Sequence, residues 1–514
     1  MLVRLTGSFF VFAACFRLSA ANFTVSGVVV NSLTSEPLSH ALVQSTGAEQ
    51  KVAFTGQDGR FQLEGVPQGT VFFVAQKPGF FDPGGRRSPV RVGSDTSLVT
   101  IKLAPESSIE GRVTDRDGEA IEGLTVQCMH QSIMNGRKTW QMTGGAQTDE
   151  TGNFHLQGLQ PGSYLLRTGS QPLFPNFNFQ NANDSLPQQA YPPHFYPDAA
   201  DLSSAQPLIL HPGETARADF SITPVPAFRV SGMASPAQGR IFGTVQSGEG
   251  GQPNSGFMVD PRTGAWHTPA LPAGSWNIVL QSVRGTDSSF YAEQSVNVTS
   301  SDIKNVQMHL EPLASIPVNV VSAAPADQRQ VQIQLMADVQ SLENNRMFGS
   351  SRSPQNLNET PMVRSVPPGT YTAFAMPYGG GCLASISAGG VDLTRSSLVV
   401  AAGGQPAPID VTLEDNCASI QGQVHMDNPA ANASVILAPS SHAIQPQATG
   451  LQEDGSFTFN RISPGDYRLY AVSTADGLEY GNPEAMRQVD GVSVTVTAKQ
   501  KATVTLTLVA RDGN

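Results

Sequence analysis

Apolar and polar residues alternate one by one along several short stretches of this chain. Phe61-Gln62-Leu63-Glu64, Phe154-His155-Leu156-Gln157 and Phe457-Thr458-Phe459-Asn460 each place apolar side chains on one face and polar side chains on the other. This period of two predicts half-buried antiparallel strands. Nowhere does the sequence alternate helix and strand patterns, so the chain is predicted to be all-β.

A turn containing Pro and Gly recurs five times between such strands. Each copy starts with an aliphatic residue and ends with a hydroxyl or acid followed by a bulky residue: Val66–Val71, Leu159–Tyr164, Leu271–Trp276, Val366–Tyr371 and Ile462–Tyr467. In four copies a second Gly lies ten positions before the turn Gly, and an aromatic residue follows it by two. Recurrence at the spacing of one small domain indicates a tandem array of one module.

Each module is expected to be a β-sandwich of about seven short strands. The expected boundaries are 22–105, 106–226, 227–313, 314–415 and 416–514, after a signal segment over 1–21. A Gly in the opening strand of most modules predicts a bulge or a close backbone approach. The fourth module lacks this Gly and has Glu359 and Pro361 where the others have the second Gly and the aromatic. Because alternating strands flank every turn, we expect hairpin to follow hairpin.

These motifs resemble the carboxypeptidase regulatory-like domain, a transthyretin-like sandwich also grouped with starch-binding-domain-like folds. The second module carries them best, in Ile109–Val113, Thr148–Phe154 and Leu159–Tyr164. The resemblance implies five transthyretin-like or immunoglobulin-like β-sandwiches in tandem. Such domains occur as non-catalytic appendages of metallocarboxypeptidases and in exported bacterial proteins, where carbohydrate or protein binding is commonly inferred. We therefore expect no cofactor, and carbohydrate, another envelope polymer or protein as the partner.

Charge and the N-terminus narrow the location and the partners. The net charge is −11 without a basic run, which excludes nucleic acid as a partner because phosphate binding needs clustered Lys and Arg. Arg4, the apolar run from Leu5 to Phe16 and the small residues before Asn22 are typical of an export signal. An uncleaved anchor and lipidation at Cys15 stay open. No later segment is long and apolar enough to span a bilayer, so we expect a secreted, periplasmic or cell-surface protein.

Three cysteines follow the signal segment. The alternation around Cys128 places it on the inward face of its strand with Leu124 and Val126, which predicts a buried structural thiol. Cys382 and Cys417 are the candidate disulfide pair for an oxidising compartment. Spacing alone does not place their Cα atoms within bonding distance.

Candidate catalytic groups are weak. His211-Pro212-Gly213-Glu214 fits the letters of a zinc-binding His-x-x-Glu, but the Pro-Gly pair predicts a turn, and a third ligand on a rigid scaffold is missing. Asp115–Glu119 is better explained as a turn than as a calcium loop, and His155 as a solvated histidine. Motifs for serine hydrolysis, dinucleotide binding and phosphate binding are absent. We predict no metal site and no enzyme activity.

The second module contains one segment that the repeat does not require, between Leu173 and Asp201. Its aromatic residues lie among Pro, Asn and Asp, a composition that suits stacking on sugars and equally suits packing back on the module or its neighbour. The candidate ligand-binding residues are Phe174, Phe177, Tyr191, Phe195 and Tyr196, together with Trp140. Trp266 and Trp276 occupy core positions of the repeat and are predicted to be buried.

Three functions remain. The leading hypothesis is a non-catalytic exported protein that binds carbohydrate or another envelope polymer. The alternatives are a structural or adhesive cell-surface stalk that binds proteins through sheet edges, and an accessory module of a secreted peptidase. Coplanar aromatics on one exposed face would favour the first hypothesis, and insertion aromatics buried between modules would favour the second.

Overall fold

The computed structural model describes residues 22–511 except 47–49, 83–89, 95, 97, 135, 170–187, 203, 238, 248–254, 283–289, 323–330, 339–346, 350–360, 379, 427–432, 453 and 476. The expected signal segment lies outside the described residues. In the described parts, the helical element is one 3-10 turn, η2 (Ala485–Gln488), and strands form the rest of the regular structure. The all-β prediction is confirmed. Contacts divide the chain into two compact units, one made mainly of the residues up to Ile109 with 157–161 and 210–216, the other of the remaining residues.

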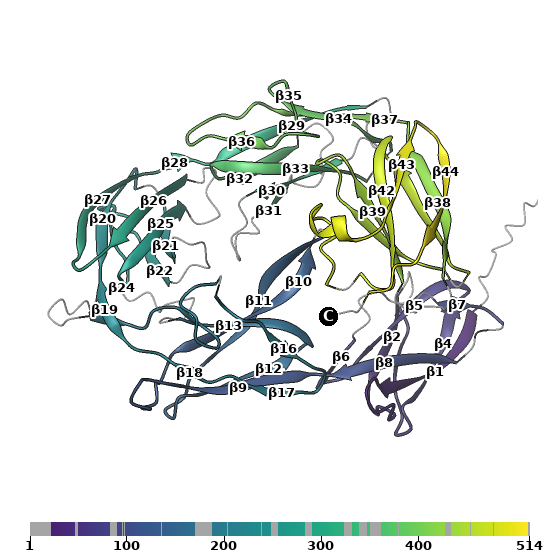
Figure 1. Cartoon of the computed structure of the whole chain (residues 1–514), viewed down its shortest axis with the longest axis horizontal. Helices are drawn as coiled ribbons and strands as arrows, with labels where there is room; N and C mark the ends of the chain where they lie inside the picture. Colours follow the sequence, from purple (N-terminus) through teal and green to yellow (C-terminus); the bar gives the residue numbers. More distant parts are fainter. Residues whose placement is uncertain are drawn as a thin grey trace, which may run out of the picture. The chain divides into compact units, whose positions relative to one another are not determined.

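We use "module" for each of the five expected segments, because the same first sheet recurs in each (Figure 1). The opening strand pairs antiparallel with the strand that precedes the Pro-Gly turn and parallel with a closing strand. The opening, preceding and closing strands are β1 (Asn22–Asn31), β4 (Arg60–Pro67) and β8 (Val99–Pro105); β9 (Ser107–Thr114), β12 (Asn153–Leu159) and β17 (Thr215–Arg217) with β18 (Phe220–Ser221); β20 (Val230–Ser235), β23 (Ala265–His267) and β27 (Ile303–His309); β29 (Ala314–Ser322), β32 (Met362–Val366) and β37 (Ile409–Glu414); β38 (Ala418–His425), β41 (Ser456–Ile462) and β44 (Lys501–Thr507).

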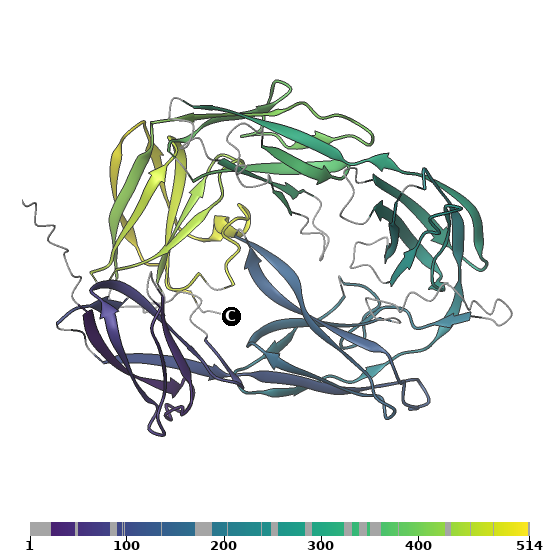
Figure 2. The same cartoon turned by 180° about the vertical axis from the view of Figure 1, so that it is seen from behind.

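A second sheet in each module contains the strand that follows the Pro-Gly turn (Figure 2). In chain order, the second sheets comprise β2 (Leu42–Thr46), β3 (Val52–Phe54), β5 (Gly69–Gln76) and β7 (Val90–Val92); β10 (Thr125–Met134), β11 (Arg137–Gln147), β13 (Gly162–Gly169), β15 (His194–Phe195) and β16 (Leu208–Leu210); β21 (Ile241–Ser247), β22 (Ser255–Met258), β25 (Gly274–Ser282), β26 (Phe290–Val298) and β28 (Glu311–Pro312); β30 (Val331–Ala337), β31 (Met347–Gly349), β33 (Gly369–Pro377) and β36 (Leu398–Val400); β39 (Ser434–Pro439), β40 (Gln447–Gly450), β42 (Gly465–Val472) and β43 (Val492–Val496). β6 (Phe80–Phe81), β34 (Cys382–Ala388) and β35 (Val391–Asp392) extend first sheets.

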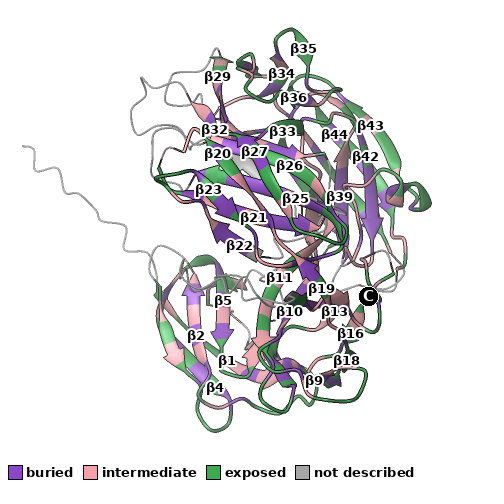
Figure 3. Cartoon of the chain, turned by 90° about the vertical axis from the view of Figure 1, so that its left-hand side faces the viewer, coloured by how far each residue is buried: buried purple, intermediate pink, exposed green. Residues whose placement is uncertain are grey.

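The core of each module lies between its two sheets. In the first module, Val25 and Leu63 of the first sheet join Val43 and Phe73 of the second in one buried apolar cluster. Buried and exposed residues alternate along these strands, as the period of two predicts (Figure 3). Each module is therefore a two-layer sandwich with its apolar faces inward.

The expectation that hairpin follows hairpin is wrong at the Pro-Gly turns. The strands on either side of the turn, such as β4 and β5, lie in different sheets. The turn glycines have φ between +140° and +156°, a region that residues with a Cβ rarely adopt. The aromatic residue after the turn holds it from within, because Tyr467 Oη donates to the Ser463 carbonyl at 2.7 Å. Strand alternation looks the same in both cases, so the sequence pattern does not distinguish a hairpin from a crossing between sheets.

The opening-strand glycines provide room for the closing strand and for the aromatic ring that recurs in four modules. A Cβ added at Gly422 would overlap the Val504 carbonyl oxygen of β44 and come within 2.8 Å of the Phe457 ring. The expected close backbone approach is thus what these glycines permit. In the fourth module Val318 takes this position, and its amide donates to the carbonyl of Pro361, which has no large ring to accommodate.

Trp266 and Trp276 are 3% and 4% exposed, which confirms the prediction that both are buried. Trp276 Nε1 donates to the Pro272 carbonyl at 3.0 Å, whereas Trp266 Nε1 is buried with no hydrogen-bond partner among the described residues. Trp276→Phe is expected to destabilise the protein by about 1–3 kcal/mol, because it leaves a carbonyl unpaired. Trp266→Phe is expected to cost less, since it removes an unpaired donor. Urea unfolding of both variants measures the difference, and the reverse order would contradict this account.

Candidate functional site

The candidate ligand segment of the second module packs back onto the second sheet. Phe195 on β15 is 7% exposed and joins Met129, Leu165 and Ala199 in an apolar cluster. Trp140 on β11 packs half-buried against the same cluster. The structure therefore brings Trp140 and Phe195 together, but in a satellite core where the Phe195 ring has no free face for a sugar.

The other aromatic residues of the insertion differ in burial and in their neighbours. Tyr196 is half-buried and lies edge-on to Phe220 of β18, with ring centroids 5.9 Å apart. Tyr191 is half-buried. Phe174 and Phe177 lie outside the described residues. In the described part of the segment, the rings do not form a coplanar exposed row, which the sequence offered as the sign of a polysaccharide platform.

The same segment also contributes to the junction between the second and third modules. Its strand β14 (Gln188–Ala190) pairs antiparallel with β19 (Val225–Phe228), which crosses the expected module boundary. β19 in turn pairs with β24 (Leu271–Pro272) of the third module, and Phe228 packs against that module's core. An intermodule connection held in a three-stranded sheet loses the freedom of an open linker.

The junction between the fourth and fifth modules is held covalently. The sulfurs of Cys382 and Cys417 are bonded, with their Cα atoms 5.3 Å apart, which links β34 to the residue that precedes β38. The loop after β39 also enters the fourth module: Ala375 N donates to the Ala443 carbonyl at 3.0 Å, and Ala443 is fully buried in that module's cluster. Sequence reasoning missed this loop because Ser440-Ser441-His442-Ala443 carries no pattern that separates it from a solvated turn.

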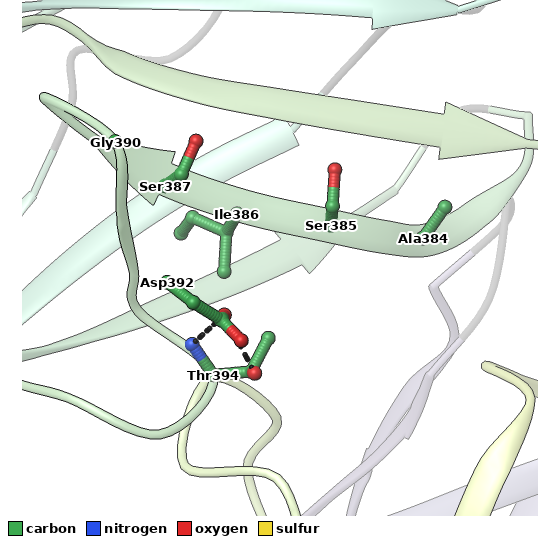
Figure 4. Close-up of a pocket in the computed structure, with 7 residues that line it drawn as sticks. All are labelled: Ala384, Ser385, Ile386, Ser387, Gly390, Asp392 and Thr394. Atoms are coloured by element: carbon green, nitrogen blue, oxygen red, sulfur yellow. Dashed lines mark hydrogen bonds between the residues drawn. The ribbon is translucent and has the colours of Figure 1, made fainter.

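The fourth module also has a shallow open pocket of about 260 Å³ beside β34 (Figure 4). The hydroxyls of Ser385 and Ser387 point to one side of β34, and Ile386 points to the other. Asp392 accepts from the Thr394 amide at 2.9 Å and from its hydroxyl at 2.7 Å, and these bonds hold the pKa of the Asp392 carboxyl below its usual value. Because this carboxylate closes its own turn and the lining offers no base, the pocket suits a water or a small polar group rather than catalysis. Its lining residues are Ala384, Ser385, Ile386, Ser387, Gly390, Asp392 and Thr394.

The predicted turn at His211–Glu214 joins β16 and β17, which lie in different sheets rather than in a hairpin. Glu214 Oε2 accepts from the His211 amide at 2.7 Å, so its carboxylate stabilises the turn itself. Among the described residues, no group of three His, Cys, Asp or Glu side chains is placed to hold a metal ion. Burial raises the pKa of the Cys128 thiol to about 11, which leaves it unreactive as a nucleophile.

Comparison with protein families identifies part of the array. Residues 24–104 and 108–182 each match the carboxypeptidase regulatory-like domain. Both matches lie within the first two modules. The resemblance that the motifs predict is confirmed for these two modules, and this family is a non-catalytic kind of domain. None of the curated proteins matches the chain. No helix in the described residues is long and apolar enough to cross a membrane.

Solved structures similar to the chain include two pilins and the TIE protein of Bacillus anthracis. The minor pilin GBS52 of Streptococcus agalactiae is 13% identical over 40% of this chain and 96% of its own, with a TM-score of 0.21. The Bacillus anthracis TIE protein is 10% identical over 99% of this chain and 76% of its own, with a TM-score of 0.18. The major pilin subunit BcpA of Bacillus cereus is 10% identical over 78% of this chain and 99% of its own, with a TM-score of 0.14. Scores of this size carry no inference about function.

The carboxypeptidase regulatory-like signature contains an acidic turn that makes stability sensitive to acid. Hydrogen bonds from Thr151 and from the Asn153 amide hold the pKa of the Asp149 carboxyl below its usual value, and bonds from Ser456 do the same for Asp454 in the fifth module. A carboxyl with a lowered folded-state pKa contributes stability above its unfolded pKa of about 3.9, and this is lost as the pH falls through the folded value.

We therefore expect stability to decline as the pH falls below about 4. Asp454→Asn keeps an acceptor for the Ser456 amide but does not titrate, so the decline should be shallower in this variant. Melting temperatures of both proteins across this pH range measure the effect. Identical declines would show that Asp454 does not contribute to the acid sensitivity.

Proposed function

We propose that this chain is an exported, non-catalytic scaffold protein of the cell envelope, in which β-sandwich modules hold binding surfaces at fixed spacing. The observation that carries the proposal is the use of segments outside the repeat. The insertion strand β14 pairs across the junction between the second and third modules, and the Cys382–Cys417 disulfide ties the fourth module to the fifth. Both features use residues that a single sandwich does not need, and both restrict bending at a junction.

The chemistry of the described side chains supports a non-catalytic role. Glu214 belongs to the His-x-x-Glu sequence, and Asp392 lines the pocket beside β34. Both carboxylates accept hydrogen bonds within their own turns. Cys128 is a buried thiol rather than an activated one. The family of the first two modules is non-catalytic as well.

Export is supported by two independent features. The residues before Asn22 have the charge and apolar pattern of a signal segment. The Cys382–Cys417 bond suits a compartment outside the reducing cytoplasm.

Thiol counting after expression with the native N-terminus tests the proposal. The exported protein, denatured without reductant and alkylated, is expected to carry one modified cysteine, Cys128, because the other two are bonded. Removing the bond with Cys382→Ser and Cys417→Ser together should lower stability by roughly 3–4 kcal/mol and expose the junction to protease. Reductant should destabilise the natural protein and leave the double variant unchanged. Retention in the cytoplasm with all four cysteines modified, Cys15 of the uncleaved signal segment included, would overturn the proposal.

Polysaccharide binding by the second module is the second candidate function. It is supported by Trp140, Tyr191 and Tyr196, which keep part of their surface exposed. Pull-down with insoluble polysaccharides and a glycan array test it. Weaker retention of Trp140→Ala at an unchanged melting temperature would support it, with Phe195→Ala as the control that lowers stability instead. Failure of the natural protein to bind any glycan would exclude it.

A further inference from the structure

The outer face of the second sheet in the first module is apolar and exposed. Phe54 and Val52 of β3 are 68% and 53% exposed, and Phe72 of β5 is 36% exposed. Cross-strand pairing places Leu42 of β2 beside Phe54 of β3. It also places Gln44 of β2 between Val52 of β3 and Val74 of β5, so these side chains share the face. We call this surface the β3 face; its residues are Leu42, Gln44, Thr46, Val52, Phe54, Phe72, Val74 and Gln76. None of them is charged, and contiguous exposed apolar surface of this kind marks interaction sites.

The centre of the equivalent face is buried in the other modules. The fifth residue after the turn glycine points outward from this sheet and is half-buried in the first module, where it is Val74. Its counterparts are 3–7% exposed: Arg167, Val279, Phe374 and Tyr470. Phe195 and Ala199 lie over this face in the second module, Leu313 in the third, and Leu478, Met486 and Val489 in the fifth. The first module thus presents the surface that its sister modules bury.

The β3 face also has an open backbone edge. β3 is the last strand of the order β3-β2-β5-β7 in the described chain. The Lys51 carbonyl accepts from Ser45 and the Thr55 amide donates to Ala41, so alternate residues of this strand point their backbone groups toward β2. The amides and carbonyls of Val52 and Phe54 consequently point away from β2, as antiparallel geometry requires. The strand therefore offers two exposed apolar side chains at one edge, together with backbone groups that no other described strand pairs with.

The size and chemistry of the β3 face indicate which kind of ligand it binds. Three strands about 4.8 Å apart and five residues at about 3.3 Å each give a face of roughly 240 Å², well below the roughly 800 Å² per partner of a stable dimer. A glycan lacks the regular donors and acceptors that match a strand edge, whereas a peptide backbone has them at the same spacing. We propose that the β3 edge binds an extended segment of a partner protein, which adds as a strand beside β3 and packs apolar side chains at alternate positions against Val52 and Phe54.

A library of linear peptides displayed on phage, selected on the full-length chain, tests this inference. We expect the selected peptides to carry apolar residues at every second position. Phe54→Ser should weaken the binding of a selected synthetic peptide by about tenfold or more, because it removes the most exposed anchor. Val52→Pro should abolish binding while β2 pairing survives, since the amide it removes points away from β2.

The matched control is Val492→Ser, which changes an exposed apolar residue on β43, an edge strand of the fifth module, and should leave the affinity unchanged. Unaltered melting temperatures in all three variants exclude unfolding as the cause of lost binding. Three results would overturn the inference: no enrichment of alternating apolar peptides, a dimer that Phe54→Ser converts to monomer, or glycan binding that Phe54→Ser removes. None of these depends on the thiol count, so the scaffold proposal and this one can fail separately.

Discussion

Replacing Tyr467 with alanine is expected to destabilise the fifth module by about 3–5 kcal/mol. Its ring is 4% exposed and belongs to the cluster that joins the two sheets of that module. Its hydroxyl donates to the Ser463 carbonyl, and burial raises the pKa of this hydroxyl, so it stays a donor at any physiological pH. The substitution removes core volume and leaves the carbonyl at the crossing between sheets unpaired.

Tyr467→Phe separates these two effects. It keeps the ring in the core and removes only the hydrogen bond, so a loss of about 1 kcal/mol is expected. The free energy of unfolding of both variants is measured by chemical denaturation, followed by far-ultraviolet circular dichroism. A melting temperature unchanged by Tyr467→Ala would show that the aromatic position after the turn does not support the core.

Gly111→Ala should be the next most damaging single substitution, with a loss of about 3 kcal/mol. An added Cβ would overlap the carbonyl oxygen of Ala218 and lie 2.9 Å from the Phe154 ring. Both neighbours are fixed, one as backbone and the other as a buried side chain, so relief requires the opening strand to separate from its neighbours. The expected result is a lower unfolding midpoint in urea for this variant.

Gly144→Ala is the matched control in the same module. A Cβ at this position on β11 meets no atom within 4 Å, so stability should stay within about 1 kcal/mol of the natural protein. Equal losses for both variants would indicate a general intolerance of alanine in these strands. The fourth module is consistent with the steric account, because it has Val318 at the glycine position and Pro361 in place of the ring.

The sequence predicts the candidate site less well than it predicts the fold. The insertion in the second module was recognised as a departure from the repeat, yet its composition fits sugar stacking and packing equally. The structure decides for packing at Phe195, because this ring covers an outward face whose Leu165 would otherwise meet water. The sequence does not predict the β3 face, because the pattern of Val52-Ala53-Phe54 is that of an ordinary strand. Val52 and Phe54 are exposed because no described segment packs over them.

Sequence alone determined the all-β class and the resemblance of the first two modules to the carboxypeptidase regulatory-like domain, because strand alternation and turn glycines reflect local backbone and burial requirements. The tertiary structure decided the rest. It showed that the Pro-Gly turns carry the chain between sheets, that Cys382 meets Cys417, and that one module leaves its outer face uncovered. These features depend on which segments distant in the chain come together, and a local pattern of residues does not encode that.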